Sequence, residues 1–146
     1  MKMALNLGCG EAYRVECVNV DLAPWIRADV TWDLRVTPWP FASERFLRII
    51  AYDVIEHLPD IIAFFNEAWR VLMPGGDIEV RTPHYQSEFV ALDPTHIRGY
   101  HPETFDYLDP EKMWGRKYVY TQLRWKVLEV RVQPDSNIIA RLEKRV

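Results

Sequence analysis

The sequence of 146 residues contains no apolar run that approaches the ~20 residues of a membrane-spanning helix. It does not open with a charged segment followed by an apolar one, which is the pattern of a secretion signal. Its two cysteines, Cys9 and Cys17, are too few for a disulfide framework. We therefore expect a cytoplasmic protein that has reduced cysteines and no membrane partner.

An excess of positive charge is also missing. The chain has 18 Lys and Arg against 21 Asp and Glu, a net charge of -3, whereas a general polyanion binder needs clustered positive charge. A set of basic residues towards the C-terminus alternates with apolar ones, which is more typical of a solvated sheet face than of a nucleic-acid groove. The set is Arg116, Lys117, Arg124, Lys126 and Arg131. We therefore do not expect nucleic acid as a partner.

No internal repeat or low-complexity tract divides the chain, and its length fits one domain spanning residues 1–146. Five short apolar or alternating runs predict β-strands at 3–7, 17–21, 28–34, 46–52 and 77–82. A helix is predicted at 59–73, starting near Pro59 and stopping at Gly75-Gly76. The gap between the first two runs is too short for a crossover helix.

Two further strands are predicted at the C-terminal end. Residues 118–132 alternate, with a change of phase near Val127-Leu128 that predicts a β-bulge. Residues 138–144 follow after a turn and would pair with them as an antiparallel hairpin. A short helix is predicted at 102–107. These elements predict an α/β fold with a mostly parallel sheet.

The first predicted strand ends in Gly8-Cys9-Gly10, and Asp21 closes the second. Two closely spaced glycines after a buried strand let backbone N–H groups approach a ligand. An acidic side chain after the second strand can accept both hydroxyls of a ribose. This combination indicates a cofactor that contains a nucleoside.

An ordered set of motifs within residues 3–82 resembles the class I S-adenosylmethionine (SAM)-dependent methyltransferases. The motifs are Leu5–Gly10, Val18–Asp21, Asp33-Leu34 before Pro38–Phe41, Asp53–Leu58 and Glu67–Gly76. Each alone is weak, and their order and spacing carry the resemblance. It implies a Rossmann-like twisted sheet whose last strand is antiparallel, SAM as the cofactor and methyl transfer as the activity.

The sequence departs from this family where helices usually precede the first strand and join the first three. The resemblance is therefore to a minimal version, trimmed at its N-terminus and with short or missing early crossover helices. A parallel sheet normally needs both faces covered. Loop aromatics could cover the helix-poor face, and so could a second copy in a homodimer. The aromatics are Tyr13, Trp25, Trp32 and Trp39.

The resemblance also implies a cofactor site. Gly8 and Gly10 would lie beside the aminoacyl end of SAM, and Asp21 would bind the ribose hydroxyls. Asn6 stands where the family often has an acid, and its carbonyl would accept from the ammonium group.

Asp33 and Leu34 would lie beside the adenine, although a turn-capping role for Asp33 is the alternative. The remaining implied positions are Cys9, Leu22, Asp53, Val54 and His57.

Methyl transfer from a sulfonium needs an aligned acceptor and, for an oxygen or nitrogen acceptor, a base. Residues 83–117 follow the fifth strand and are expected to form the acceptor-binding loop region. The candidate bases are His57, His84, Asp93 and His96, with His101 as a further histidine of the same region. Each could also be a surface or structural residue. Their spacing along the loop is not a zinc pattern, so we expect no metal.

The leading hypothesis is a SAM-dependent methyltransferase that acts on an oxygen or nitrogen atom of a small molecule. The main alternative is a weakly active or inactive methyltransferase-like subunit that binds SAM and serves in assembly. A nicotinamide-dependent enzyme is a third. It requires a third glycine that opens a helix, and Tyr13-Arg14 occupy that place.

Overall fold

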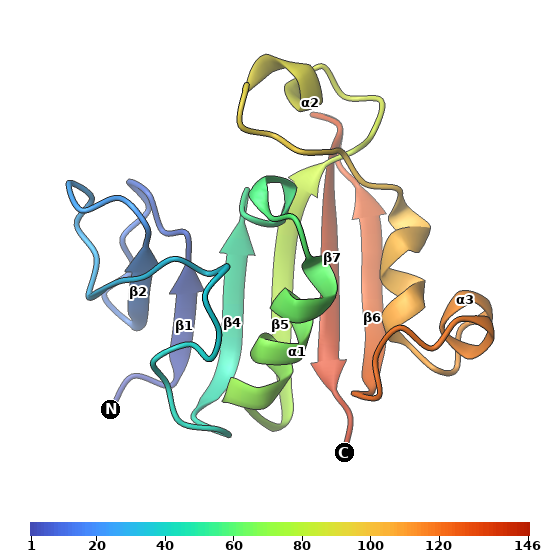
Figure 1. Ribbon diagram of the computed structural model, residues 1–146, viewed down its shortest axis with the longest axis horizontal. Coiled ribbons are helices and arrows are strands. Elements are labelled where there is room, and N and C mark those ends of the chain that lie inside the picture. Colours follow the sequence, from blue (N-terminus) through green and yellow to red (C-terminus); the bar gives the residue numbers. More distant parts are fainter.

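The computed structural model describes residues 1–146 and contains one seven-stranded sheet with the order β3-β2-β1-β4-β5-β7-β6 (Figure 1). The strands are β1 (Ala4–Leu7), β2 (Cys17–Asp21), β3 (Val30–Thr31), β4 (Phe46–Tyr52), β5 (Leu72–Pro83), β6 (Trp125–Val132) and β7 (Asn137–Lys144). Neighbours are parallel except that β7 runs antiparallel to both β5 and β6. The predicted Rossmann-like α/β fold with an antiparallel C-terminal hairpin is confirmed.

The early crossovers contain no helix between β1 and β2 or between β2 and β3, as predicted. The third strand is shorter than the predicted 28–34, because only Val30–Thr31 pairs with β2. The chain turns soon afterwards, since the Asp33 carboxylate accepts from the backbone N–H of Arg35 at 3.0 Å. That local turn removes residues 33 and 34 from the sheet edge.

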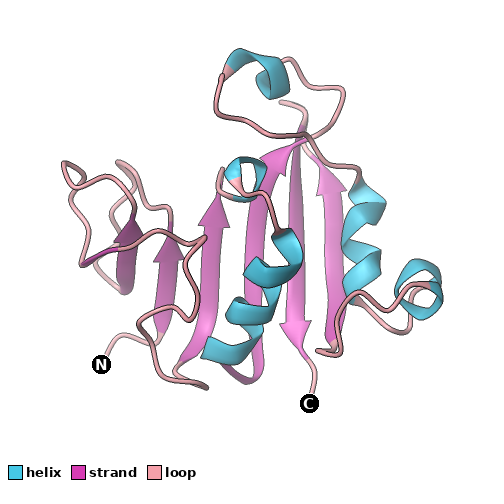
Figure 2. Cartoon of the chain, in the orientation of Figure 1, coloured by secondary structure: helices cyan, strands magenta, loops and turns pink.

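The helix α1 (Ile61–Val71) packs on one face of the sheet (Figure 2). Its N-cap is Asp60, whose side chain accepts from the Ala63 N–H at 2.9 Å. Pro59 therefore lies just before the helix and not in its first turn.

The prediction that this helix continues to residue 73 is wrong. The helix ends at Val71, and the chain enters β5 at Leu72, which pairs with Phe46 at the start of β4. Pairing with the sheet thus replaces the last helical turn. Gly75, with φ of +75°, turns the chain inside β5.

The C-terminal hairpin has the predicted bulge, because the β6–β7 register shifts between Val127 and Glu129. However, β6 begins at Trp125 and not at Tyr118. The rings of Tyr118 and Tyr120 lie 6.1 and 5.6 Å from the ring of Tyr107. This aromatic packing holds residues 118–124 away from the sheet.

Short helical elements fill the 83–117 region. They are the 3-10 helix η2 (Pro102–Leu108), where a short helix is predicted, and the helices α2 (Phe89–Leu92) and α3 (Met113–Lys117), which are not predicted. A further 3-10 helix, η1 (Ile55–His57), follows β4. Figure 2 shows α1 in front of the sheet and no helix on the opposite face.

A segment without helix, residues 37–41, lies on the same face as α1. Trp39 is buried, and its ring lies 5.5 Å from that of Phe64. The backbone N–H of Trp39 donates to the Glu67 carboxylate at 2.7 Å. Arg70 bonds the same carboxylate and also the Trp39 carbonyl. These contacts hold a loop without helix against the same face of the sheet as α1.

The opposite face of β1 and β2 is covered by the loop that joins them. Asn6 and Asn19 pair in register, and the Asn6 amide donates to Asn19 Oδ1 at 3.0 Å and to the Ala12 carbonyl at 2.9 Å. Asn19 is fully buried and bonds both the N–H and the carbonyl of Arg14. A network of side-chain amides thus holds the loop where the family has a helix.

The opposite face of β4, β5 and β7 carries charged side chains. Arg48 lies 3.7 Å from Asp77 and 3.2 Å from Glu79, and Arg141 also pairs with Asp77. Tyr52 donates to Glu79. A face of this kind can meet water as one-sided antiparallel sheets do. The homodimer therefore stays a prediction, which light scattering at micromolar concentration decides by giving the mass of a dimer or of a monomer.

The aromatics expected to cover this face mostly do not. Trp25 is 83% exposed, Trp39 lies on the α1 face, and Trp32 packs against the core while donating to the Val36 carbonyl. Tyr13 does lie in the covering loop. The buried amides, not aromatic rings, are what hold this loop in place.

We expect Asp29→Asn to destabilise the protein at pH 7 by on the order of 1 kcal/mol, discounted because the side chain is 32% exposed. Bonds from the N–H and amide of Asn19, then from Tyr13 and Lys2, hold the pKa of Asp29 well below its usual range. A lowered folded pKa stabilises the fold above the unfolded pKa of about 4, and this contribution is lost as the pH falls further. Urea unfolding should therefore show a difference between wild type and variant that shrinks from pH 7 to about pH 3. An unchanged difference would contradict this role.

Candidate functional site

The carboxyl ends of β1, β2, β4 and β5 meet at one edge of the sheet, where open α/β sheets bind ligands (Figure 1). Gly8 ends β1 with φ of +59°, and a Cβ there would lie 2.5 Å from Val54 Cγ2. Only glycine fits this close approach between the turn and the end of β4. Gly10, with φ of +49°, faces open space.

Asp21 at the end of β2 is tied to this glycine turn. Its Oδ2 accepts from the Gly10 N–H at 2.8 Å, and its Oδ1 accepts from the Ala23 N–H at 2.9 Å. Each carboxylate oxygen has a second lone pair for another donor. The structure thus sets the predicted ribose ligand directly against the glycine turn.

A cavity of about 280 Å³ lies next to Asp21. Its lining residues are Leu22, Thr31, Trp32, Asp33 and Val36. Three of the five, Leu22, Trp32 and Val36, are apolar and could pack on a planar ring. Leu34 does not line this cavity but belongs to a separate, smaller one beside the start of α1.

Three residues predicted to bind the cofactor have structural partners as well. Asn6 uses its amide hydrogens on Ala12 and Asn19, as described above. Cys9 is buried, and its thiol donates to the Arg27 carbonyl at 3.7 Å. Asp33 is held by Arg35 through both its carboxylate oxygens, which lowers its pKa. Asp33 thus has the turn contact that is the alternative to an adenine role.

The end of β4 is strained. Asp53 has φ of +58°, and its side chain pairs with Arg81 of β5. Non-glycine residues with such backbone angles concentrate at functional sites. The chain then enters η1, which directs Glu56 into the protein and leaves His57 half-buried at its end.

Glu56 is fully buried. Its Oε2 accepts from the Thr82 hydroxyl at 3.1 Å, whereas its Oε1 has no hydrogen-bond partner. Burial, together with the nearby Asp53 carboxylate, raises the pKa of Glu56 to about 7. A buried acid without a full set of partners is a strong indication of a functional site. Glu56 is not among the predicted site residues, although it stands inside the Asp53–Leu58 motif.

His57 and His96 come together although they are 39 positions apart in the chain. Their rings are 4.6 Å apart at 70°. The Ile97 N–H donates to the Glu56 carbonyl at 2.8 Å, which fixes the segment that carries His96 against η1. Asp93 Oδ2 lies 3.7 Å from His96 Nε2. Three of the predicted catalytic residues therefore form one cluster.

This cluster borders a cavity of about 340 Å³. Its lining residues are Asp53, Glu56, His57, Pro83, Phe89, Leu92, Asp93, His96 and Asn137. Five of these residues lie in the 83–117 region, whose role in binding the acceptor stays a prediction. Its lining combines polar and apolar groups.

His84 does not line this cavity. Its ring lies 4.5 Å from that of Tyr85 and 6.4 Å from that of His101. His101 caps η2, because its Nδ1 accepts from the Glu103 N–H. The predicted histidines therefore divide into two groups, and only His57 and His96 face the cavity.

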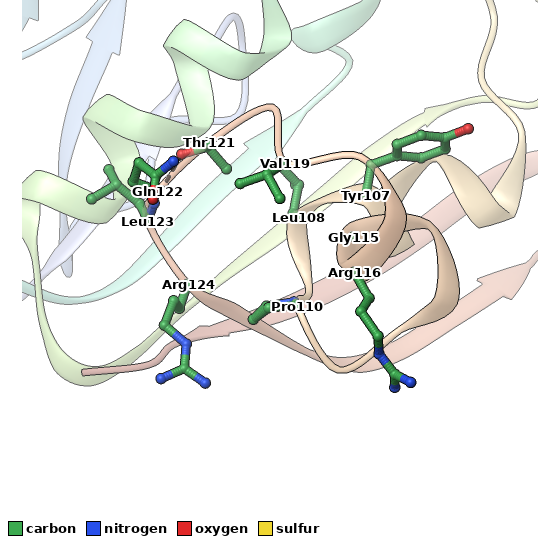
Figure 3. Close-up of a pocket in the computed structure, with 10 residues that line it drawn as sticks. All are labelled: Tyr107, Leu108, Pro110, Gly115, Arg116, Val119, Thr121, Gln122, Leu123 and Arg124. Atoms are coloured by element: carbon green, nitrogen blue, oxygen red, sulfur yellow. Dashed lines mark hydrogen bonds between the residues drawn. The ribbon is translucent and has the colours of Figure 1, made fainter.

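A further hollow, of about 290 Å³, lies between η2, α3 and the segment that leads into β6 (Figure 3). Figure 3 shows Leu108 and Val119 at its centre and Arg116 and Arg124 pointing outward. It adjoins the start of β6, so it cannot serve chemistry at the glycine turn. None of the helices is both long and apolar enough to cross a membrane.

The fold and this site define a class I SAM-dependent methyltransferase. A family model described as a methyltransferase domain, Methyltransf_11, matches residues 5–80. The chain belongs to this family, and SAM is its cofactor. No curated protein matches the sequence closely enough to be recognised.

Solved structures share the fold at low sequence identity. A methyltransferase of Haloferax volcanii in complex with the Trm112 activator has a TM-score of 0.68 at 13% identity, covering 98% of this chain and 82% of that one. A SAM-dependent methyltransferase of Archaeoglobus fulgidus has a TM-score of 0.68 at 13% identity, with 97% and 85% covered. An S-adenosylmethionine-dependent methyltransferase of Mesorhizobium loti has a TM-score of 0.67 at 12% identity, covering 97% of this chain and 90% of that one.

Proposed function

We propose that the protein transfers the methyl group of SAM to an oxygen or nitrogen atom of a small molecule bound in the cavity beside Glu56, His57 and His96. The observation that carries the proposal is the position of this cavity. It opens at the carboxyl ends of β4 and β5, and it shares Asp53 with the predicted cofactor site.

The residues present fit SAM. Gly10 leaves open space at the turn, Asp21 offers carboxylate oxygens at the end of β2, and a partly apolar cavity begins at Leu22. Asp21 would hold the ribose, and Leu22 and Trp32 would enclose the adenine. When bound, SAM supplies an activated methyl group on a sulfonium.

The acceptor side offers proton acceptors in a partly apolar space. His96 Nδ1 lies 2.7 Å from the Phe89 carbonyl, which can only accept, so Nδ1 carries the hydrogen. Its Nε2 is then free to take a proton from an acceptor O–H or N–H. Phe89 and Leu92 line the same space and make it partly apolar.

We expect His96→Asn to lower the rate of methyl transfer by about 10²–10⁴-fold while the Kd for SAM stays unchanged, because the change removes a proton acceptor and not a cofactor contact. Transfer of a radiolabelled methyl group to members of a broad acceptor panel measures the rate, and calorimetry measures the Kd. His101→Asn is the matched control, since asparagine also caps helices and His101 lies outside the cavity. Wild-type turnover in His96→Asn would refute the assignment.

An assembly subunit that binds SAM is the second candidate, and an exposed aromatic cluster favours it. Tyr107, Trp114, Tyr118 and Tyr120 have ring centroids 5.6–6.3 Å apart, and Tyr120 is 59% exposed. The Haloferax volcanii structure shows that a protein of this fold can bind a partner protein. Firm SAM binding with no product from any acceptor would favour this candidate.

A further inference from the structure

One ligand atom from each of Glu56, His57 and His96 lies within 4.8 Å of the others. Glu56 and His57 come from η1 after β4, and His96 comes from the loop after α2. The bond from the Ile97 N–H to the Glu56 carbonyl holds the two segments together. This convergence is therefore part of the fold and does not depend on the conformation of a single exposed side chain.

The hydrogen bonds around both histidines fix which nitrogen is free. The Thr95 hydroxyl donates its one hydrogen to Asp93 Oδ1 at 2.7 Å, so it must accept from His57 Nδ1 at 2.9 Å. His96 Nδ1 likewise donates to the Phe89 carbonyl. Both rings therefore keep an unprotonated Nε2 when neutral.

No donor faces these lone pairs. Glu56 Oε1 is fully buried and has no hydrogen-bond partner. His96 Nε2 lies 3.7 Å from Asp93 Oδ2, so an acceptor faces an acceptor. A cation among the atoms would satisfy these lone pairs, whereas a buried acceptor left alone is costly.

We propose that Glu56, His57 and His96 bind a divalent transition-metal ion, with Asp93 at its edge. Two imidazoles and one carboxylate suit Zn²⁺, Mn²⁺ or Fe²⁺ better than Mg²⁺ or Ca²⁺, which prefer oxygen ligands. The bonds from each Nδ1 are the outer contacts that orient metal-binding histidines. The adjoining cavity of about 340 Å³ leaves room for an acceptor atom on the ion.

This proposal replaces the sequence-based expectation of no metal. That expectation rests on the spacing of His84, His96 and His101, and it does not consider Glu56. The proposed function describes the ion-free protein, in which His96 Nε2 takes the proton; with the ion bound, His57 and His96 would instead orient an acceptor oxygen through it. The metal site itself does not depend on methyl transfer, so the two proposals can fail separately.

The test is equilibrium dialysis of chelator-treated full-length protein against Zn²⁺ or Mn²⁺, with the bound metal counted by mass spectrometry. We expect one ion per wild-type chain. Glu56→Gln and His96→Asn should each weaken binding by more than about tenfold. Glu56→Gln keeps an acceptor for the Thr82 hydroxyl, and His101→Asn is the control that should bind as wild type does.

Circular dichroism confirms that each variant is folded, and His57→Asn replaces any that is not. Absence of bound metal in the wild type would overturn the proposal. So would unchanged binding in the folded variants, because the ion would then lie elsewhere.

Discussion

Gly8→Ala is expected to lower the free energy of unfolding by about 2–4 kcal/mol. About 1–2 kcal/mol comes from placing alanine at φ of +59°. The rest comes from a Cβ 2.5 Å from Val54 Cγ2, because valine is stiff and cannot turn away. Urea unfolding followed by circular dichroism measures the change.

Gly10→Ala separates the two contributions. Gly10 has a φ of +49°, similar to that of Gly8, but a Cβ at Gly10 would meet no atom within 4 Å. It should therefore cost only about 1–2 kcal/mol. In the double variant Gly8→Ala with Val54→Ala, the clash is relieved and part of the stability returns. Equal losses for the two glycine variants would show that the contact with Val54 does not constrain the turn.

Asp21→Ala is expected to weaken SAM binding by about 1–3 kcal/mol, which is about 5- to 150-fold in Kd. The carboxylate is the predicted ribose ligand, and it also fixes the glycine turn through the Gly10 N–H at 2.8 Å. Calorimetry with SAM and with S-adenosylhomocysteine measures the loss. Both ligands should be affected equally, because they share the ribose.

The two roles of Asp21 can be distinguished. Asp21→Asn keeps one oxygen for the backbone and should restore much of the stability but less of the affinity. Asp33→Ala is a matched comparison, because Asp33 lies in the neighbouring cavity and its oxygens are held by Arg35. Unchanged SAM affinity in Asp21→Ala would mean that the ribose binds elsewhere.

Local patterns in the sequence were sufficient for much of this structure. The period of apolar residues predicts β1, β2 and β4, and the change of phase at Val127 predicts the bulge. Turn chemistry places Gly8 and Asp21 at strand ends, and parallel strands bring those ends to one edge. The ordered motifs then point to the family that the comparison confirms for residues 5–80.

The rest depends on contacts between distant residues. No sequence motif predicts the hydrogen bond between Asn6 and Asn19. In the sequence, Asn6 is only a replacement for the acid that the family often has there. The helix was predicted too long because Leu72 pairs with β4, and β6 too long because Tyr118 packs on Tyr107. Similarly, His84, His96 and His101 share one polar loop, and only the fold sets His96 beside His57 and away from the other two.

Glu56 shows the same limit at the site. Its motif is visible in the sequence, but its burial and its unpaired oxygen follow from the contact of η1 with Thr82 and with the segment at Ile97. A charged residue beside a histidine in a helix start is usually solvated, so the sequence offered no reason to single it out.

The most direct test is a crystal structure of the protein with S-adenosylhomocysteine. We expect the ribose hydroxyls to donate to the Asp21 carboxylate and the sulfur to face the cavity beside Glu56, His57 and His96. A ligand whose sulfur faces away from this cavity, or whose ribose lies elsewhere than at Asp21, would contradict the proposed site of methyl transfer.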